Sequence, residues 1–277
     1  MNHNYRPIGF VVLMGIFAVG GTAIWYWLSD AKTIFMSSDG TKFYRILSGV
    51  VDSQYERNNE DDLKIQVPTV VCPAPVRLGA AADGGKWMCA PWRVRRVRSC
   101  VAYSVGVGGD VSWEFQLREQ YAHCEIYSFD SNADWWRKML LDASSTKLIA
   151  RNVEDDGISS IHGFAAAHGH RRIDFLKIDI EGQGPEFTML PRLTQLIASN
   201  RLHVCQLMLE THTLESAQLI GLLKTIEASG FEMFAHEPNV ICGKFCQEYS
   251  FVHRRCFALY GIRRSAVIHH NFELLKE

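Results

Sequence analysis

The stretch CVAYSVGVGGDVSWEFQLREQYAHCEIYSFD, residues 100–130, decides the fold of this chain. Its apolar residues 101–105 predict a buried strand, and the glycine-rich turn after them leads into an amphipathic helix over about residues 112–121. A second apolar run, residues 125–129, predicts another strand that ends on Asp130. A strand, a tight turn, a helix and a second strand make up half of a nucleotide-binding α/β sheet.

The turn in this stretch contains three glycines, Gly106, Gly108 and Gly109. Glycine allows positive φ angles and places no Cβ between the backbone and a ligand. Asp130 follows Gly106 by 24 residues, a spacing at which an acidic side chain can reach a ribose diol at the carboxyl edge of the sheet. The stretch therefore predicts a nucleoside site. A tight turn beside a solvated aspartate is the alternative.

Strands and helices continue to alternate after Asp130. Strands are predicted at residues 147–150, 173–180, 204–209, 231–235 and 249–253, the last continuing toward 258–261, and helices at residues 133–143, 158–168, 185–200 and 214–229. This order, with a strand pair at the end, predicts a seven-stranded doubly wound α/β sheet.

Composition excludes several classes of protein. Of the 277 residues, 47% are hydrophobic and 21% charged, as in a folded protein. The formal net charge of -1 creates no overall field for nucleic acid, so no nucleic acid partner is expected. All eight cysteines follow residue 71, which fits an oxidising compartment and disulfides of undetermined pairing. No CxxC or histidine spacing typical of zinc accompanies them, and no metal site is predicted.

The amino-terminal region contains a candidate membrane anchor. Residues 8–28, IGFVVLMGIFAVGGTAIWYWL, carry no charge over 21 positions, which is enough for a helix to span a bilayer. We expect a tail at 1–7, an uncleaved signal-anchor at 8–28, a polar stem at 29–71 and the folded domain at 72–277. A cleaved signal peptide is the alternative. The cysteines favour a domain on the luminal side of the Golgi or endoplasmic reticulum.

Charged side chains gather on the predicted strand within IDFLKIDIEG, residues 173–182. Because strand side chains alternate, Lys177, Asp179 and Glu181 point to one side. Three charges on one face of a buried strand are costly unless they meet a ligand or one another. These residues are candidates for a substrate site, and a structural pair of Lys177 and Asp179 is the alternative.

Two other strand ends also carry polar groups. Glu210 and His212 follow the strand at 204–209, and Asn152 follows the one at 147–150, where it is a candidate for contact with an adenine. Histidine titrates near neutral pH, so His212 is the predicted general base, with Glu210 or Asp179 orienting it. A polar loop accounts for Asn152 equally well.

Six motifs together carry a family resemblance. They are DGGKWMC (83–89), YSVGVGGDVSWEF (103–115), YSFD (127–130), IDFLKIDIEG (173–182), LETH (209–212), and EPN with EYSFV (within 237–252). With these motifs the chain resembles a class I S-adenosylmethionine-dependent methyltransferase of the FkbM type. Within that type it is most similar to the membrane-anchored methyltransferase-like proteins (methyltransferase domain 22) of animals. The resemblance covers roughly residues 72–260.

The resemblance implies roles for particular residues. Its cofactor would be S-adenosyl-L-methionine, bound by Gly106, Gly108 and Asp130. The residues implied on the substrate side are Asp179, Glu181, Glu210 and His212. Ser104 stands where such enzymes commonly carry an acidic residue, and we include it in the cofactor site. The implied reaction is O-methyl transfer to a hydroxyl of a glycan or small molecule, by an enzyme anchored in a secretory-pathway membrane.

Alternative functions remain open at this stage. Ser104, the inserted Gln183 and Gly184, and the short segment 150–172 depart from the family pattern and also fit a catalytically inactive binding module. An NAD-dependent enzyme would need a glycine at position 111, where Val111 stands. A membrane-tethered structural protein would give no reason for charges at three separate strand ends.

Overall fold

The computed structural model describes residues 68–264 except 82, 98, 109, 131–145, 151–156, 181, 183–184, 213–215, 240 and 242–245. Before residue 68 it describes the backbone of five short strands. The chain divides into two compact units, Met1–Leu63 and Lys64–Glu277, each of which has its own internal structure.

A seven-stranded sheet forms the centre of the second unit, in the order β11-β10-β9-β12-β13-β15-β14. The bounds are β9 Cys100–Val105, β10 Cys124–Asp130, β11 Thr146–Ala150, β12 Ile173–Ile178, β13 Val204–His212, β14 Phe231–Pro238 and β15 Cys246–His253. The first five strands of the order pair in parallel, and β15 lies antiparallel between β13 and β14. The predicted doubly wound sheet is confirmed.

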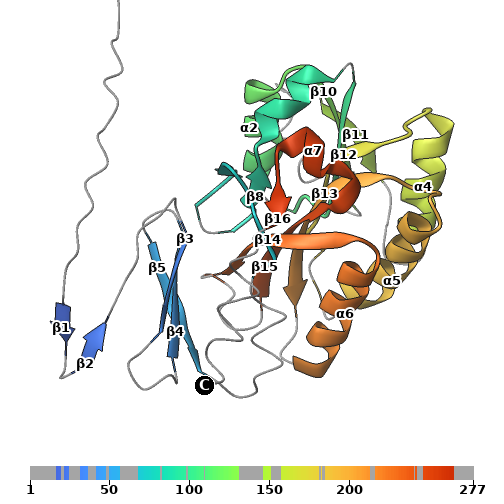
Figure 1. Cartoon of the computed structure of the whole chain (residues 1–277). Helices are drawn as coiled ribbons and strands as arrows, with labels where there is room; N and C mark the ends of the chain where they lie inside the picture. Colours follow the sequence, from blue (N-terminus) through green and yellow to red (C-terminus); the bar gives the residue numbers. More distant parts are fainter. Residues whose placement is uncertain are drawn as a thin grey trace, which may run out of the picture. The chain divides into compact units, whose positions relative to one another are not determined.

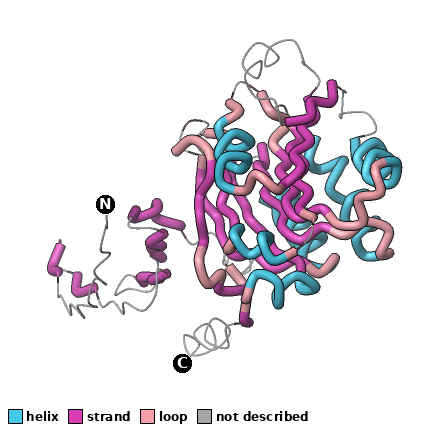
Figure 2. Tube along the Cα trace, turned by 90° about the horizontal axis from the view of Figure 1, so that it is seen from above, coloured by secondary structure: helices cyan, strands magenta, loops and turns pink. Residues whose placement is uncertain are grey.

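Helices cover both faces of this sheet (Figures 1 and 2). Their bounds are α2 Ser112–Gln120, α4 Gly157–Ala167, α5 Pro185–Ala198, α6 Ser216–Ala228 and α7 Phe257–Tyr260, with 3₁₀ turns η1 Pro91–Arg96 and η3 Arg254–Cys256. Side chains of β9 alternate between two apolar cores: Tyr103 and Val105 pack with α4 and α5, whereas Ala102 packs with α2 and η1. The helix predicted at 133–143 lies outside the described residues.

Strand ends differ from the predictions in several places, and β14 and β15 are both longer than predicted. β12 ends at Ile178, so Asp179 lies just beyond the strand, whereas β13 continues through His212. The predicted strand at 258–261 is wrong because the chain leaves the sheet at His253. The His253 imidazole accepts the Arg255 N–H and starts η3, and Gly261, with a φ of 69°, ends α7.

A small antiparallel ribbon, β7 Pro75–Leu78 and β8 Lys86–Cys89, packs on β13 and β15. The Gln206 side chain of β13 both accepts the Cys89 N–H and donates to the Cys89 carbonyl, each at 2.8 Å. This two-way contact fixes β8 against the sheet and places Lys86 over its carboxyl edge. Beside the ribbon, β6 Val70–Val71 pairs with β16 Arg263–Arg264.

The first unit contains only strands among its described residues. β1 Phe17–Val19 pairs with β2 Thr22–Ile24, and β3 Lys32–Met36, β4 Lys42–Leu47 and β5 Val50–Glu56 form a three-stranded sheet. The segment predicted as a stem therefore contains regular structure. β1 and β2 fall within the predicted anchor, most of which is not described. In the described parts of the chain, no helix combines the length and apolarity that crossing a bilayer requires.

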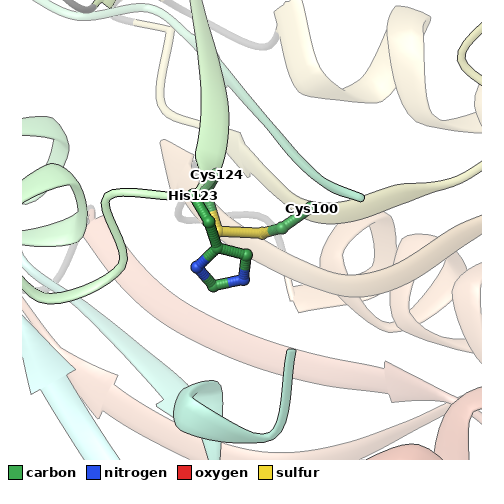
Figure 3. Close-up of side chains that lie close together, drawn as sticks. All are labelled: Cys100, His123 and Cys124. Carbon is green, nitrogen blue, oxygen red and sulfur yellow. A yellow bond between two sulfur atoms is a disulfide. The ribbon is translucent and has the colours of Figure 1, made fainter. Parts of the chain in front are cut away.

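Disulfide bonds join residues of the second unit, as the cysteine content predicts. The pairs are Cys72–Cys89, Cys100–Cys124 and Cys205–Cys256, and Cys246 is also disulfide-bonded. Cys100 and Cys124 are the first residues of β9 and β10 and lie opposite each other in the sheet (Figure 3). This bond therefore locks the two strands that carry the glycine turn and Asp130.

Replacing both Cys100 and Cys124 with serine should lower the free energy of unfolding by about 3 kcal/mol. The bond closes a loop with a sequence separation of 24, and losing it gives the unfolded chain more freedom. Urea unfolding of the wild type and the double variant under non-reducing conditions measures the difference. Equal stability would show that β9 and β10 do not depend on this bond.

Candidate functional site

The glycine turn after β9 lies against the chain leaving β12. Gly106 has a φ of 75°, and a Cβ there would overlap the carbonyl oxygen of Asp179. The N–H of Asp179 donates to the Val105 carbonyl at 2.8 Å, which holds the two segments together. Gly108, with a φ of 58°, faces open space instead. Gly106 is thus required by the packing of the protein, whereas Gly108 leaves its backbone open to a ligand.

Asp130 contacts this turn directly. One carboxylate oxygen, Oδ2, accepts the N–H of Val107 at 2.9 Å and the N–H of Gly108 at 3.0 Å. The structure therefore brings together the turn and the acid that the sequence singled out. A carboxylate can accept about four hydrogen bonds, so these two do not by themselves prevent Asp130 from accepting ribose hydroxyls. Gly109 and Asn152, also predicted in the cofactor site, lie outside the described residues.

Ser104 takes part in a buried charge network, not an exposed strand end. Its hydroxyl, fully buried on β9, donates to Oε1 of Glu114 on α2. The same oxygen lies 3.5 Å from Nζ of Lys177, which in turn lies 3.7 Å from Oδ2 of Asp179. An acidic group thus stands beside the Ser104 position, supplied by the following helix and not by the strand itself.

Lys86 lies at the centre of a group of carboxylates. Its Nζ is 2.9 Å from Asp179, 3.4 Å from Glu210 and 2.7 Å from Glu248, and its side chain is only 1% exposed. We call these four residues the Lys86 cluster. They come from β8, the end of β12, β13 and β15, so one ammonium group joins four segments at the carboxyl edge of the sheet.

The cluster and its neighbours contain more acids than bases. Two lysines, Lys86 and Lys177, meet four carboxyl groups, those of Glu114, Asp179, Glu210 and Glu248. Charges of one sign cannot all stay ionised when they are buried together, and we expect some of these acids to hold a proton.

The environments of the acids separate their pKa values. Burial tends to raise the pKa of Asp179, but Lys86 and Lys177 outweigh it and hold that pKa below its usual range. Burial raises the pKa of Glu248 well above its usual range, and repulsion from Glu210 and Asp179 adds to this despite Lys86. Asp179 is therefore the ionised member at neutral pH, and Glu248 is the acid best suited to keep a proton.

His212 lies between two carboxylates at the end of β13. Its Nε2 is 3.8 Å from Oε1 of Glu210 and its Nδ1 is 3.9 Å from Oε1 of Glu186 on α5. The backbone N–H of His212 donates to the same Glu186 oxygen at 2.6 Å. The structure places His212 beside Glu210, as the sequence suggested. Glu181 lies outside the described residues.

Asn239 connects the acids at the far end of the cluster. Its Nδ2 donates to Oε1 of Glu210 at 2.9 Å and to Oδ1 of Asp83 at 3.0 Å. Glu210 therefore divides its two oxygens, one toward Asn239 and His212 and the other toward Lys86. This division fixes the orientation of the carboxylate beside the histidine.

Several of these residues were not predicted as site residues: Lys86, Glu114, Glu186, Asn239 and Glu248. Four of them, Lys86, Glu114, Asn239 and Glu248, lie inside the quoted motifs DGGKWMC, YSVGVGGDVSWEF, EPN and EYSFV. The available signal was a charged or amide side chain within an otherwise apolar strand or at its end. That signal does not show which other charged groups a residue meets in the folded protein. The sequence therefore could not assign an ion-pair or hydrogen-bond partner to any of them.

Three groups of side chains in the described residues bring possible metal ligands within 4.8 Å of one another. They are Cys100 with His123 and Cys124, His203 with Cys205 and Cys256, and Glu210 with His212 and Cys246. Figure 3 shows the first group, in which the His123 ring lies beside the disulfide. In every group the cysteine sulfurs are already in disulfide bonds, so they cannot bind a metal as thiolates.

Comparison with known proteins points to one family. A family model described as a methyltransferase domain matches residues 52–253. No curated protein matches the chain.

Solved structures align with much of the chain. Methanococcus jannaschii fibrillarin aligns at 9% identity and a TM-score of 0.41, covering 83% of this chain and 97% of that one. Aeropyrum pernix fibrillarin, with natively bound S-adenosyl-L-methionine, aligns at 10% identity and a TM-score of 0.40, covering 87% of this chain and 100% of that one. The magnesium protoporphyrin IX methyltransferase of Synechocystis PCC 6803, with bound SAM, aligns at 13% identity and a TM-score of 0.40, covering 59% of this chain and 76% of that one. Likeness at these TM-scores supports no statement about activity.

Gly106→Ala should lower the free energy of unfolding by more than about 3 kcal/mol, because the new Cβ meets the Asp179 backbone and the φ is positive. Gly163→Ala is the matched control, since it lies in α4 with nothing within 4 Å of an added Cβ. It should leave stability unchanged or raise it by up to about 1 kcal/mol. Urea unfolding compares them, and equal effects would contradict the close crossing at Gly106.

Glu248→Gln should flatten the pH dependence of stability. Because the pKa of Glu248 is raised from 4.5 in the folded protein, folding takes up a proton above about pH 4.5. Wild-type stability therefore falls as pH rises from there toward the raised pKa. Glutamine does not titrate and removes this contribution. Urea unfolding between about pH 5 and 8 measures the slope, with exposed Glu119→Gln as control. Identical slopes for Glu248→Gln and wild type would refute the raised pKa.

Proposed function

The chain belongs to the methyltransferase-domain family, and we propose that within it this protein transfers the methyl group to a hydroxyl acceptor at the carboxyl edge of the sheet. Methyl transfer and the cofactor, S-adenosyl-L-methionine, follow from the family; the acceptor is our proposal. The observation that carries it is the contact path from the glycine turn, through Asp179, Lys86 and Glu210, to His212. This path connects the candidate base to the turn that fits the cofactor through three intervening residues.

The cofactor side of the site is formed by the turn after β9 and the end of β10. The Asp130 carboxylate is fixed by two turn amides, and the open space at Gly108 lets a ligand approach the backbone. Both features fit a ribose lying over the switch between β9 and β12. S-adenosyl-L-methionine bound there supplies a methyl group on a sulfonium, which is already a good leaving group.

The acceptor side then has to orient a hydroxyl and remove its proton. His212 is largely buried at the end of β13, with 10% of its side chain exposed, and its backbone N–H donates to Glu186. The neighbouring Glu210 and Glu186 can stabilise the positive charge that the imidazole gains when it takes a proton. A base in this position accounts for about 10² to 10⁴ in rate for a hydroxyl acceptor.

The charge of this edge supports a neutral acceptor. Half-buried or buried acids near this edge include Glu210 and Glu237 on strands, Asp83 in the loop between β7 and β8, and Glu186 on α5. The Trp87 indole donates to Glu237 at 2.6 Å. Carboxylates and an indole suit a polyhydroxylated molecule such as a glycan, and they repel phosphates. This supports a glycan or small hydroxyl-bearing acceptor over a nucleic acid.

We further propose a membrane-anchored enzyme whose domain lies in the lumen of the secretory pathway. Three disulfides within one domain are support for an oxidising compartment. The uncharged run at residues 8–28 supports the anchor.

His212→Ala should lower the methyl-transfer rate by about 10² to 10⁴ while the affinity for S-adenosyl-L-methionine stays the same. Asp130→Ala should instead weaken the affinity for S-adenosyl-L-methionine by about 10- to 100-fold, because a charged hydrogen-bond acceptor is lost. Calorimetry measures affinity, and transfer of labelled methyl groups to glycans of secretory membranes measures the rate.

The two variants separate the alternatives. Full transfer by His212→Ala would end the assignment of that residue as the base. Cofactor binding by the wild type without transfer to any hydroxyl acceptor would favour the inactive binding module. Urea unfolding of both variants checks that each is folded.

A further inference from the structure

The buried ammonium group of Lys86 has no part in the proton transfer described above. It is almost fully buried and has three carboxylates within 3.4 Å. An ammonium group has three donors and no acceptor, so the number of donors equals the number of carboxylates around it. Clusters of carboxylates at strand ends otherwise bind divalent cations such as Mg²⁺. Here the centre of the cluster is already taken by a cation that belongs to the chain.

We propose that Lys86 is a positioning residue whose ammonium group takes the place of a divalent cation, orienting Asp179 and Glu210 so that methyl transfer needs no added metal ion. This inference rests on the proposed function, because it assigns Glu210 a task beside His212. It concerns the acceptor side of the site and not the binding of the cofactor.

The position of Lys86 is fixed by several contacts that do not involve its charge. β8 packs on β13 and β15, and Gln206 holds the backbone of Cys89 in both directions. Cys89 is also tied to Cys72 by a disulfide. The ammonium group is therefore held at the cluster by a rigid ribbon, as a bound ion would be held by its ligands.

Lys86 is not suited to be a base itself. Burial alone would lower its pKa, but Asp179, Glu248 and Glu210 outweigh burial and raise that pKa above its usual range. The side chain thus stays protonated throughout the physiological pH range, and its effect on the reaction has to pass through the carboxylates.

Glu210 is the carboxylate through which Lys86 acts. Its Oε2 contacts Lys86, whereas its Oε1 accepts from Asn239 and faces the His212 ring. Without the ammonium group, repulsion among the three acids of the cluster would favour protonation of Glu210. A protonated Glu210 no longer stabilises a charged imidazole, so loss of Lys86 should change the pH dependence of the reaction.

Lys86→Met removes the charge and keeps a long side chain, and exposed Lys224→Met on α6 is the matched control. Relative to wild type, Lys86→Met should be slower by at least about 100-fold. The acid limb of its pH–rate profile should move to higher pH by about one unit. Its affinity for S-adenosyl-L-methionine should be retained. Lys224→Met should match the wild type in all three measurements.

Divalent ions provide a second readout that does not depend on activity. Excess EDTA and excess Mg²⁺ or Mn²⁺ should leave the melting temperature and the methyl-transfer rate of the wild type unchanged. In Lys86→Met, Mn²⁺ should raise the melting temperature, because the empty centre of the cluster now accepts a cation.

Two results obtained with the wild type or with Lys86→Met would overturn the proposal. One is a wild type that loses activity in EDTA and regains it with Mg²⁺. The other is a Lys86→Met protein with a reduced rate and an unchanged pH–rate profile, which would leave Lys86 a purely structural role.

If Lys86→Met does not fold, Lys86→Arg is the second variant. It keeps the positive charge and should keep the wild-type pH–rate profile, and a shifted profile would refute the proposal. A wild type without any methyl transfer would instead refute the proposed function, while the Mn²⁺ measurement still tests Lys86.

Discussion

The candidate site depends on one buried ammonium group among three carboxylates. Lys86 draws together the end of β12, the end of β13 and the start of β15, all at the same edge of the sheet. Removing one partner from a buried charge cluster leaves the others uncompensated, which is far more costly than breaking a surface ion pair. The geometry of the acids beside His212 is therefore set by a residue that lies outside the central sheet.

A second constraint links this cluster to the glycine turn. The Asp179 backbone crosses Gly106 closely enough to exclude a side chain there, while the Asp179 carboxylate bonds to Lys86. One residue thus belongs to both halves of the site. Two strands that run parallel and adjacent, β9 and β12, bring this about at the point where the order of the sheet reverses. The cofactor side and the acceptor side are thus joined at Asp179, through its backbone on one side and its carboxylate on the other.

Disulfides stabilise the domain mostly away from this edge. Cys100–Cys124 joins the amino ends of β9 and β10, and Cys205–Cys256 ties the start of β13 to η3. These bonds fix the amino ends of the strands, and the charged residues occupy the carboxyl ends. The disulfide-bonded Cys246 is an exception, because it lies at the carboxyl edge beside Glu210 and His212. The histidines next to these disulfides, which could suggest metal sites by distance alone, have no thiolate to share a metal with.

By itself the sequence determined the order along the chain of the strands in the central sheet and of the described helices α2 to α6, and the glycine turn, because apolar periodicity and positive φ are properties of neighbouring residues. Its spacing also singled out Asp130 as a candidate beside that turn. It also placed Asp179, Glu210 and His212 at strand ends. Only the tertiary structure decided what those groups meet. Lys86 contacts Glu210 and Glu248 across 124 and 162 residues, and Glu186 on α5 contacts His212 on β13. Such contacts arise from how a ribbon and a helix pack on the sheet, which no local pattern encodes.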